Sequence, residues 1–79
     1  MAATLKLAGE NAVTYVVEWF GKEAKIYKKN DELYADVTTN EQALIYWCLQ
    51  YGESVELVTP TKTREEIKKI IDAMQKKYQ

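Results

Sequence analysis

The sequence predicts a single α+β domain over residues 1–79, a ferredoxin-like βαββαβ sandwich with an additional C-terminal amphipathic helix. Three observations predict this fold. In several short segments apolar residues alternate with polar ones, as they do in half-buried strands. In longer segments apolar residues recur at helical spacing, beside capping residues or glycines. The two patterns follow one another in the order strand, helix, strand, strand, helix, strand, helix.

The first strand and helix are predicted at residues 4–8 and 12–20. Asn11 stands where it can cap the helix with its side chain. The helical segment is rich in valine, which favours strands. Its apolar residues nevertheless have i, i+3, i+4, i+7 spacing, and Gly21 follows as a helix stop, so we predict a helix. These apolar residues are Val13, Val16, Val17 and Phe20.

A β-hairpin is predicted next, with strands at residues 24–28 and 33–38 and a polar turn at residues 29–32. Because strand side chains alternate between two faces, the pattern divides the hairpin into a core face and an opposite face. The core face is predicted to hold Ala24, Ile26, Leu33, Ala35 and Val37. The opposite face is predicted to hold Lys25, Tyr27, Tyr34, Asp36 and Thr38.

The second half of the chain is predicted to form a helix at residues 40–51, a strand at 55–59 and a last helix at 63–78. Residues 39–42 (TNEQ) and 63–66 (TREE) each have the form of a capping box. The last helix carries an apolar stripe that needs to be covered by this domain, a partner copy or a neighbouring domain. The stripe consists of Ile67, Ile70, Ile71, Met74 and Tyr78.

The composition argues against several classes of function. A net charge of −1 lacks the basic excess of a free-standing nucleic-acid binder. There is no histidine and only one cysteine, which removes the commonest general base and most zinc sites. The three glycines are scattered and form no phosphate-binding loop. We therefore expect no enzymatic activity, no cofactor and no metal site.

The lone Cys48 cannot form an internal disulfide and lies on an apolar helix stripe, where a buried, inert thiol is expected. The N-terminus lacks the features of a signal peptide, and no apolar run approaches the ~20 residues needed to cross a bilayer. We expect a cytoplasmic chain that makes no contact with a membrane.

Two groups of residues are candidates for contacts. Lys25, Tyr27 and Tyr34 are expected on an uncovered sheet face, where aromatic rings can stack on a ligand or on nucleic-acid bases. The alternative is that the tyrosines form a cross-strand pair that only stabilises the sheet. Apolar residues on the first and last helices are candidates for an interface with another copy or domain. The interface candidates are Tyr15, Trp19, Ile70, Met74 and Tyr78.

Residues 47–67 (WCLQYGESVELVTPTKTREEI) read as a helix end, a glycine stop, a short strand, a proline and a capped helix. This run resembles the closing segment of the C-terminal extension, or WCX, domain of bacterial WYL-domain transcriptional regulators. The segment LKLAGENAVTYVVEWFG at residues 5–21 and the final REEIKKIIDAMQKKY are similar to the same family.

The resemblance implies a C-terminal regulatory or dimerisation domain that contributes to effector sensing. It further implies a homodimer or upstream WYL and helix-turn-helix domains as partners, and a nucleotide or single-stranded nucleic acid as a possible effector. No helix-turn-helix precedes Met1 and the Trp-Tyr-Leu triplet is absent, so we do not expect these residues to bind an operator directly.

Two alternatives belong to other classes. One is a stand-alone ferredoxin-like domain that senses a small molecule. The other is a small enzyme acting on phosphorylated substrates, as acylphosphatases do with an arginine in the loop after the first strand. Here that loop, residues 8–11 (AGEN), is acidic, and the only arginine is Arg64, far along the chain.

Overall fold

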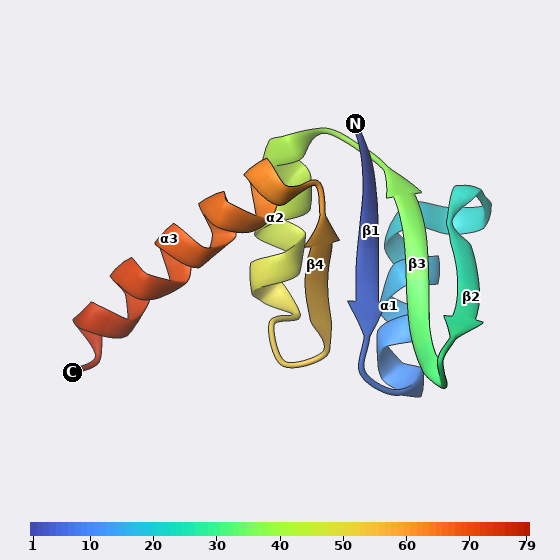
Figure 1. Cartoon of the computed structure of the whole chain (residues 1–79), viewed down its shortest axis with the longest axis horizontal. Coiled ribbons are helices and arrows are strands. Elements are labelled where there is room, and N and C mark those ends of the chain that lie inside the picture. The colour runs from blue at the N-terminus through green and yellow to red at the C-terminus, as the bar shows by residue number, and fades with distance from the viewer.

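The computed structural model describes residues Met1–Gln79 and contains one four-stranded sheet with helices in the order βαββαβα (Figure 1). The predicted α+β class is confirmed. The elements are β1 Ala2–Leu7, α1 Glu10–Phe20, a 3-10 turn Gly21–Glu23, β2 Lys25–Lys29, β3 Glu32–Thr38, α2 Glu41–Gln50, β4 Val55–Thr59 and α3 Thr61–Lys77.

The strands lie in the order β2-β3-β1-β4, and every neighbouring pair is antiparallel. The central strand β1 pairs with β3 from Ala2 opposite Thr38 to Leu7 opposite Leu33. On its other side β1 pairs with β4, with Leu5 opposite Leu57. The edges of the sheet are therefore β2 and β4, and the last strand of the chain lies next to the first.

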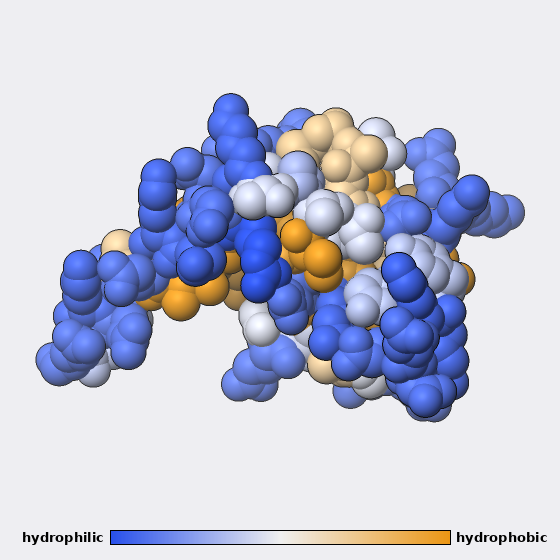
Figure 2. Space-filling view, in the orientation of Figure 1, coloured by the Kyte–Doolittle hydropathy of each residue, from blue (hydrophilic) through white to orange (hydrophobic).

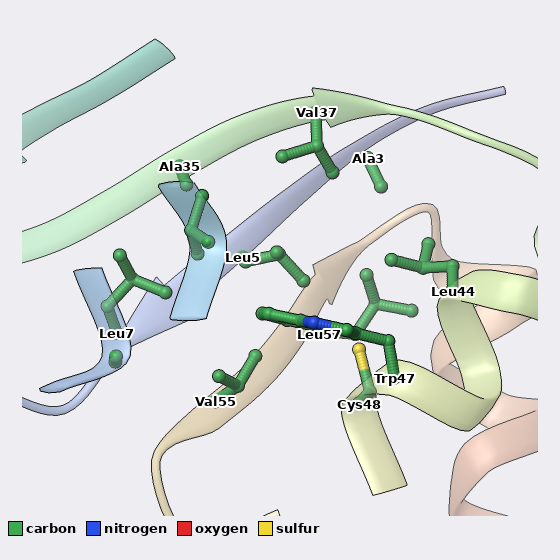
Figure 3. Packing of buried hydrophobic residues seen from close by; sticks show 12 residues of the cluster. Ala3, Leu5, Leu7, Ala35, Val37, Leu44, Trp47, Cys48, Val55 and Leu57 are labelled. Carbon is green, nitrogen blue, oxygen red and sulfur yellow. The ribbon is translucent and has the colours of Figure 1, made fainter. Parts of the chain in front are cut away.

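The core lies between one face of the sheet and helices α1 and α2 (Figure 3). The strands contribute alternate side chains, as predicted: Ala35 and Val37 are buried, and Ile26 and Leu33 are partly buried against the same cluster. The indole of Trp47 fills the space between α2 and the sheet. The buried cluster comprises Ala3, Leu5, Leu7, Ala12, Val16, Ala35, Val37, Leu44, Trp47, Cys48, Val55 and Leu57.

The predictions of how the helices begin were wrong in three places. Helix α1 begins at Glu10, after Gly9 with φ 93, so Asn11 lies inside the helix and does not cap it. In α2 the cap is Asn40 and not Thr39, because the Asn40 side chain accepts a hydrogen bond of 2.7 Å from the Ala43 amide. Helix α3 begins at Thr61, directly after Pro60.

The physical reasons lie in residues next to the predicted caps. Glycine reaches a positive φ without a steric penalty, and an extended proline, here with φ −77 and ψ 152, is a suitable residue to precede a helix. Thr63 thus becomes the third residue of α3, where it is buried and donates a hydrogen bond of 2.9 Å to Glu41 Oε2 of α2.

The hairpin turn is also tighter than predicted, since only Asn30 and Asp31 separate the strands, both with positive φ as a type I′ turn requires.

One residue of the predicted apolar stripe of α1 does not face the core. Val17 is half exposed, whereas Ala12 and Val16 are buried. The buried side of α1 is therefore centred on its smaller residues, which lets the helix lie close to the sheet.

We expect Leu5→Ala to lower the free energy of unfolding by about 2–5 kcal/mol, because it removes a fully buried side chain from the central strand. Val17→Ala, at a half-exposed position, should change it by no more than about 0.5 kcal/mol. Urea unfolding followed by circular dichroism measures both. Equal effects of the two substitutions would contradict the observed orientation of β1 and α1.

We expect Asn40→Ala to cost about 1 kcal/mol of stability, because the Ala43 amide loses its acceptor. Thr39→Ala is the matched control, since no side-chain hydrogen bond of Thr39 stabilises the helix start. The same urea titration compares them. A larger loss for Thr39→Ala would show that the original capping-box prediction was right.

Candidate functional site

The side of the sheet opposite α1 and α2 forms an open sheet face, defined by the outward side chains of Thr4, Lys6, Lys25, Tyr27, Glu32, Tyr34, Asp36 and Glu56. The structure brings together the three predicted contact residues on this face. Tyr27 lies directly opposite Tyr34 in the register of β2 and β3, and Lys25 lies opposite Asp36. The tyrosine rings stack with centroids 5.8 Å apart and an interplanar angle of 19°.

Asp36 holds one end of this face together. Its Oδ1 accepts hydrogen bonds of 3.0 Å from the hydroxyls of both Tyr27 and Thr4. Loss of solvent around the phenol, reinforced by the hydrogen bond to Asp36, raises the pKa of Tyr27. Asp36 of β3 thus connects the Tyr27 hydroxyl of β2 with the Thr4 hydroxyl of β1.

Glu32 binds side chains at the other end of the open sheet face. It accepts a hydrogen bond of 3.3 Å from the Tyr34 hydroxyl and forms an ion pair with Lys6 at 3.0 Å. The hydrogen bond with Glu32 raises the pKa of Lys6, and the same hydrogen bond lowers the pKa of Glu32. Sequence reasoning placed Glu32 in the turn and missed this pair, because contacts between β1 and β3 depend on a register that alternation alone does not fix.

A second surface is a groove of about 650 Å³ between α3 on one side and α2 and β4 on the other. We call it the α3 groove. In Figure 2 apolar atoms follow the lower side of α3, where the helix faces the body of the domain. Its lining consists of Cys48, Leu49, Gly52, Val55, Glu56, Leu57, Arg64, Ile67, Lys68, Ile71, Met74, Gln75 and Tyr78.

Arg64 fixes the position of α3 against β4. One guanidinium nitrogen, Nη1, donates to Glu56 Oε2 at 2.7 Å and to the Leu57 carbonyl at 2.8 Å. The bond from Thr63 to Glu41 ties the same turn of α3 to α2. The first turns of α3 are therefore attached to the domain, and the rest of the helix projects beyond the sheet (Figure 1).

The predicted interface residues lie in two separate places. Tyr15 and Trp19 are on α1, where Tyr15 stacks on Tyr51 at 4.2 Å and Trp19 is 59% exposed. Met74 and Tyr78 are on the projecting part of α3 and are 43% and 88% exposed. Ile70 is partly buried on the same helix.

Ile71 was on the predicted stripe but not among the predicted interface residues, yet it is 50% exposed and lines the α3 groove. Helical spacing alone does not distinguish Ile70 from Ile71 as the more exposed residue, because both belong to one stripe. Their difference depends on where α2 and β4 lie against the helix.

Cys48 is buried on α2, and burial raises the pKa of its thiol to about 12. The thiol therefore remains neutral, as expected from its position on an apolar stripe. No cluster of three or more potential metal-ligating side chains occurs, and no helix is both long and apolar enough to traverse a bilayer.

Comparison with known proteins identifies the class. The model of the WCX domain family matches residues 1–75, and the chain belongs to this family. The resemblance drawn from residues 47–67 is thereby confirmed.

The chain is also similar to YobV of Bacillus subtilis (strain 168), described as an uncharacterized HTH-type transcriptional regulator, with 34% identity over 64 residues. That match covers 78% of this chain and 20% of YobV, so the chain spans about a fifth of this relative. No solved structure matches the chain.

We expect Cys48 to resist alkylation by iodoacetamide in the folded protein and to react once urea unfolds it. The pKa of the Cys48 thiol is about 12 in the folded chain, above its ordinary value of 9.0. Burial of the neutral thiol therefore stabilises the folded state fully below pH 9, and this stabilisation is lost as the pH rises through 12. At mildly alkaline pH the thiolate fraction should be about 1,000-fold lower than in the unfolded chain. Mass spectrometry measures the labelling rate, and rapid labelling without urea would contradict the burial of Cys48.

Proposed function

We propose that this chain is the C-terminal regulatory and dimerisation domain of a WYL-type transcriptional regulator, acting in the cytoplasm. In this role it contributes to effector sensing and does not bind the operator directly. Membership of the WCX family and the similarity to a helix-turn-helix regulator about four times its length support this context. The observation that carries the proposal is the uncovered apolar part of α3, where Ile71, Met74 and Tyr78 face solvent. Such a surface is typical of a protein that associates.

We also assign the domain to the ferredoxin-like class. The support is the antiparallel strand order β2-β3-β1-β4 with α1 and α2 on one face, which is the arrangement of a split βαβ unit. Helix α3 is the addition to that arrangement.

The charges on α3 support a role without direct operator contact. Lys68, Lys69 and Lys76 each lie within 3.3–3.6 Å of an acidic side chain on the same helix. Phosphate binding depends on uncompensated positive charge, and pairs of this kind reduce it. A non-catalytic role agrees with the regulator context of the family.

For effector sensing we propose the open sheet face, with Lys25, Tyr27 and Tyr34 in contact with a nucleotide or a short single-stranded nucleic acid. The stacked tyrosine pair provides a preoriented aromatic surface, since both hydroxyls are held by carboxylates. Stacking of a base on such a ring contributes about 1–3 kcal/mol.

A small-molecule sensor is the second candidate, favoured by the size of the α3 groove. Its volume of about 650 Å³ lies within the range of about 300–1,000 Å³ typical of ligand pockets, and its lining is mainly apolar. A metabolite that raises the melting temperature, where an oligonucleotide does not, would favour this function.

We expect a short single-stranded oligonucleotide to bind the chain and the binding to be lost in the double variant Tyr27→Ala/Tyr34→Ala, because the stacking surface is removed. Sedimentation equilibrium with and without a fluorescent oligonucleotide measures binding and mass together. Tyr46→Ala is the matched control, since Tyr46 is 64% exposed on α2, outside both surfaces. Circular dichroism verifies that all variants are folded. Equal binding by the double variant and the control would exclude the tyrosine pair as the contact site.

A further inference from the structure

The α3 groove is an apolar surface that the domain itself leaves partly uncovered. Its inner wall is formed by α2 and β4, and its outer wall by the side of α3 that carries Ile67, Ile71 and Met74. Ile67 packs against the buried cluster, but one turn later Ile71 is half exposed, and Met74 and Tyr78 beyond it are also exposed. The apolar stripe therefore continues for about 18 Å along a helix that only its first turns attach to the domain.

An added strand is an unsuitable occupant of this groove. Although β4 is an edge strand, two of its main-chain groups are already bonded outside the sheet. The Val55 amide donates to the Tyr51 carbonyl at 3.0 Å, and the Leu57 carbonyl accepts from Arg64 at 2.8 Å. The groove thus offers apolar side chains more than main-chain partners, which suits an amphipathic helix.

We infer that the occupant is α3 of a second copy, with the two α3 helices antiparallel about a two-fold axis near Ile71 and each helix seated in the groove of the other copy. This inference rests on the proposed dimerisation and specifies its surface. The same apolar stripe is both the wall of one groove and the ridge that fills the other, as an isologous interface requires. Two-fold closure covers Ile71, Met74 and Tyr78 of both copies at once.

The positions of Arg64 and Tyr78 on the groove side of α3 favour the antiparallel direction. Cations occur only in the N-terminal half of this side, at Arg64 and Lys68, whereas Gln75 and Tyr78 in the C-terminal half are uncharged. Both cations are already ion-paired, Arg64 with Glu56 and Lys68 with Glu65, so charge repulsion does not set the direction. In the antiparallel pair, Arg64 and Tyr78 are each seven residues from Ile71, so the guanidinium of one copy lies level with the phenol ring of the other, a favourable cation–π arrangement.

The exposed face of α3 is too small to form a dimer interface without the groove. A specific interface buries about 800 Å² on each partner. A helix face of about 18 by 10 Å is too small to supply this alone. Insertion into the groove also covers its exposed rim, Lys68 and Gln75, and the partly exposed Leu49, whereas Val55 and Leu57 are buried and add little area. Trp19 is excluded from this interface, because α1 lies behind β1 and β3, away from α3 (Figure 1).

Sedimentation equilibrium of the 79-residue chain tests the inference with Met74→Glu and the control Trp19→Glu, both at exposed positions where a charge is tolerated in the monomer. We expect a dimer whose dissociation constant rises about tenfold or more in Met74→Glu, because a carboxylate is buried in an apolar groove, and stays within about twofold in Trp19→Glu. Circular dichroism verifies that both variants are folded.

An engineered cysteine tests the two-fold axis. Under mild oxidation Ile71→Cys should form a disulfide-linked dimer, because the same residue of both copies meets at the axis. The unmodified chain, with only the buried Cys48, is the control and should remain uncrosslinked. Trp19→Cys should not crosslink beyond that control.

Each contrary result has a distinct meaning. A dimer that is weakened by Trp19→Glu but not by Met74→Glu overturns the groove interface and leaves the proposed dimerisation intact. A chain that is monomeric at every concentration overturns both.

Discussion

Strand β1 pairs with β3 on one side and with β4 on the other, and its side chains alternate between the two faces of the sheet. Leu5 and Leu7 enter the core, while Thr4 and Lys6 lie on the open sheet face and bind Asp36 and Glu32 of β3. The core and the candidate contact face therefore depend on one register. A slip of one residue in β1 would expose the leucines and separate both polar contacts.

The open sheet face and the α3 groove are connected through the polar surface of the sheet. Along it, charges of alternating sign follow one another from Glu32 to Lys6, Glu56 and Arg64. Lys6 lies opposite Glu56 in the register, and the nearby Glu56 carboxylate contributes to the raised pKa of Lys6. The open sheet face and the attachment of α3 to β4 therefore share one row of alternating charges.

Alternation along β1 and the hairpin was sufficient to predict the faces of the sheet, because a period of two is a local property of the chain. The tyrosine pair followed from it, as Tyr27 and Tyr34 lie on one face of two consecutive strands. Contacts that depend on tertiary placement were not accessible in this way. The role of Arg64 depends on the main chain of β4, and the cap at Asn40 was missed because two adjacent residues both had suitable side chains.

Arg64 also has a consequence for behaviour at high concentration. Exposed strand edges template open-ended assembly into fibrils. Here the Leu57 carbonyl on the β4 edge is occupied by the Arg64 guanidinium, and the opposite edge, β2, carries Lys25, Lys28 and Lys29, whose charges repel an approaching strand. The Arg64 guanidinium and the lysines of β2 thus disfavour sheet extension at both edges, while an apolar helix surface remains exposed.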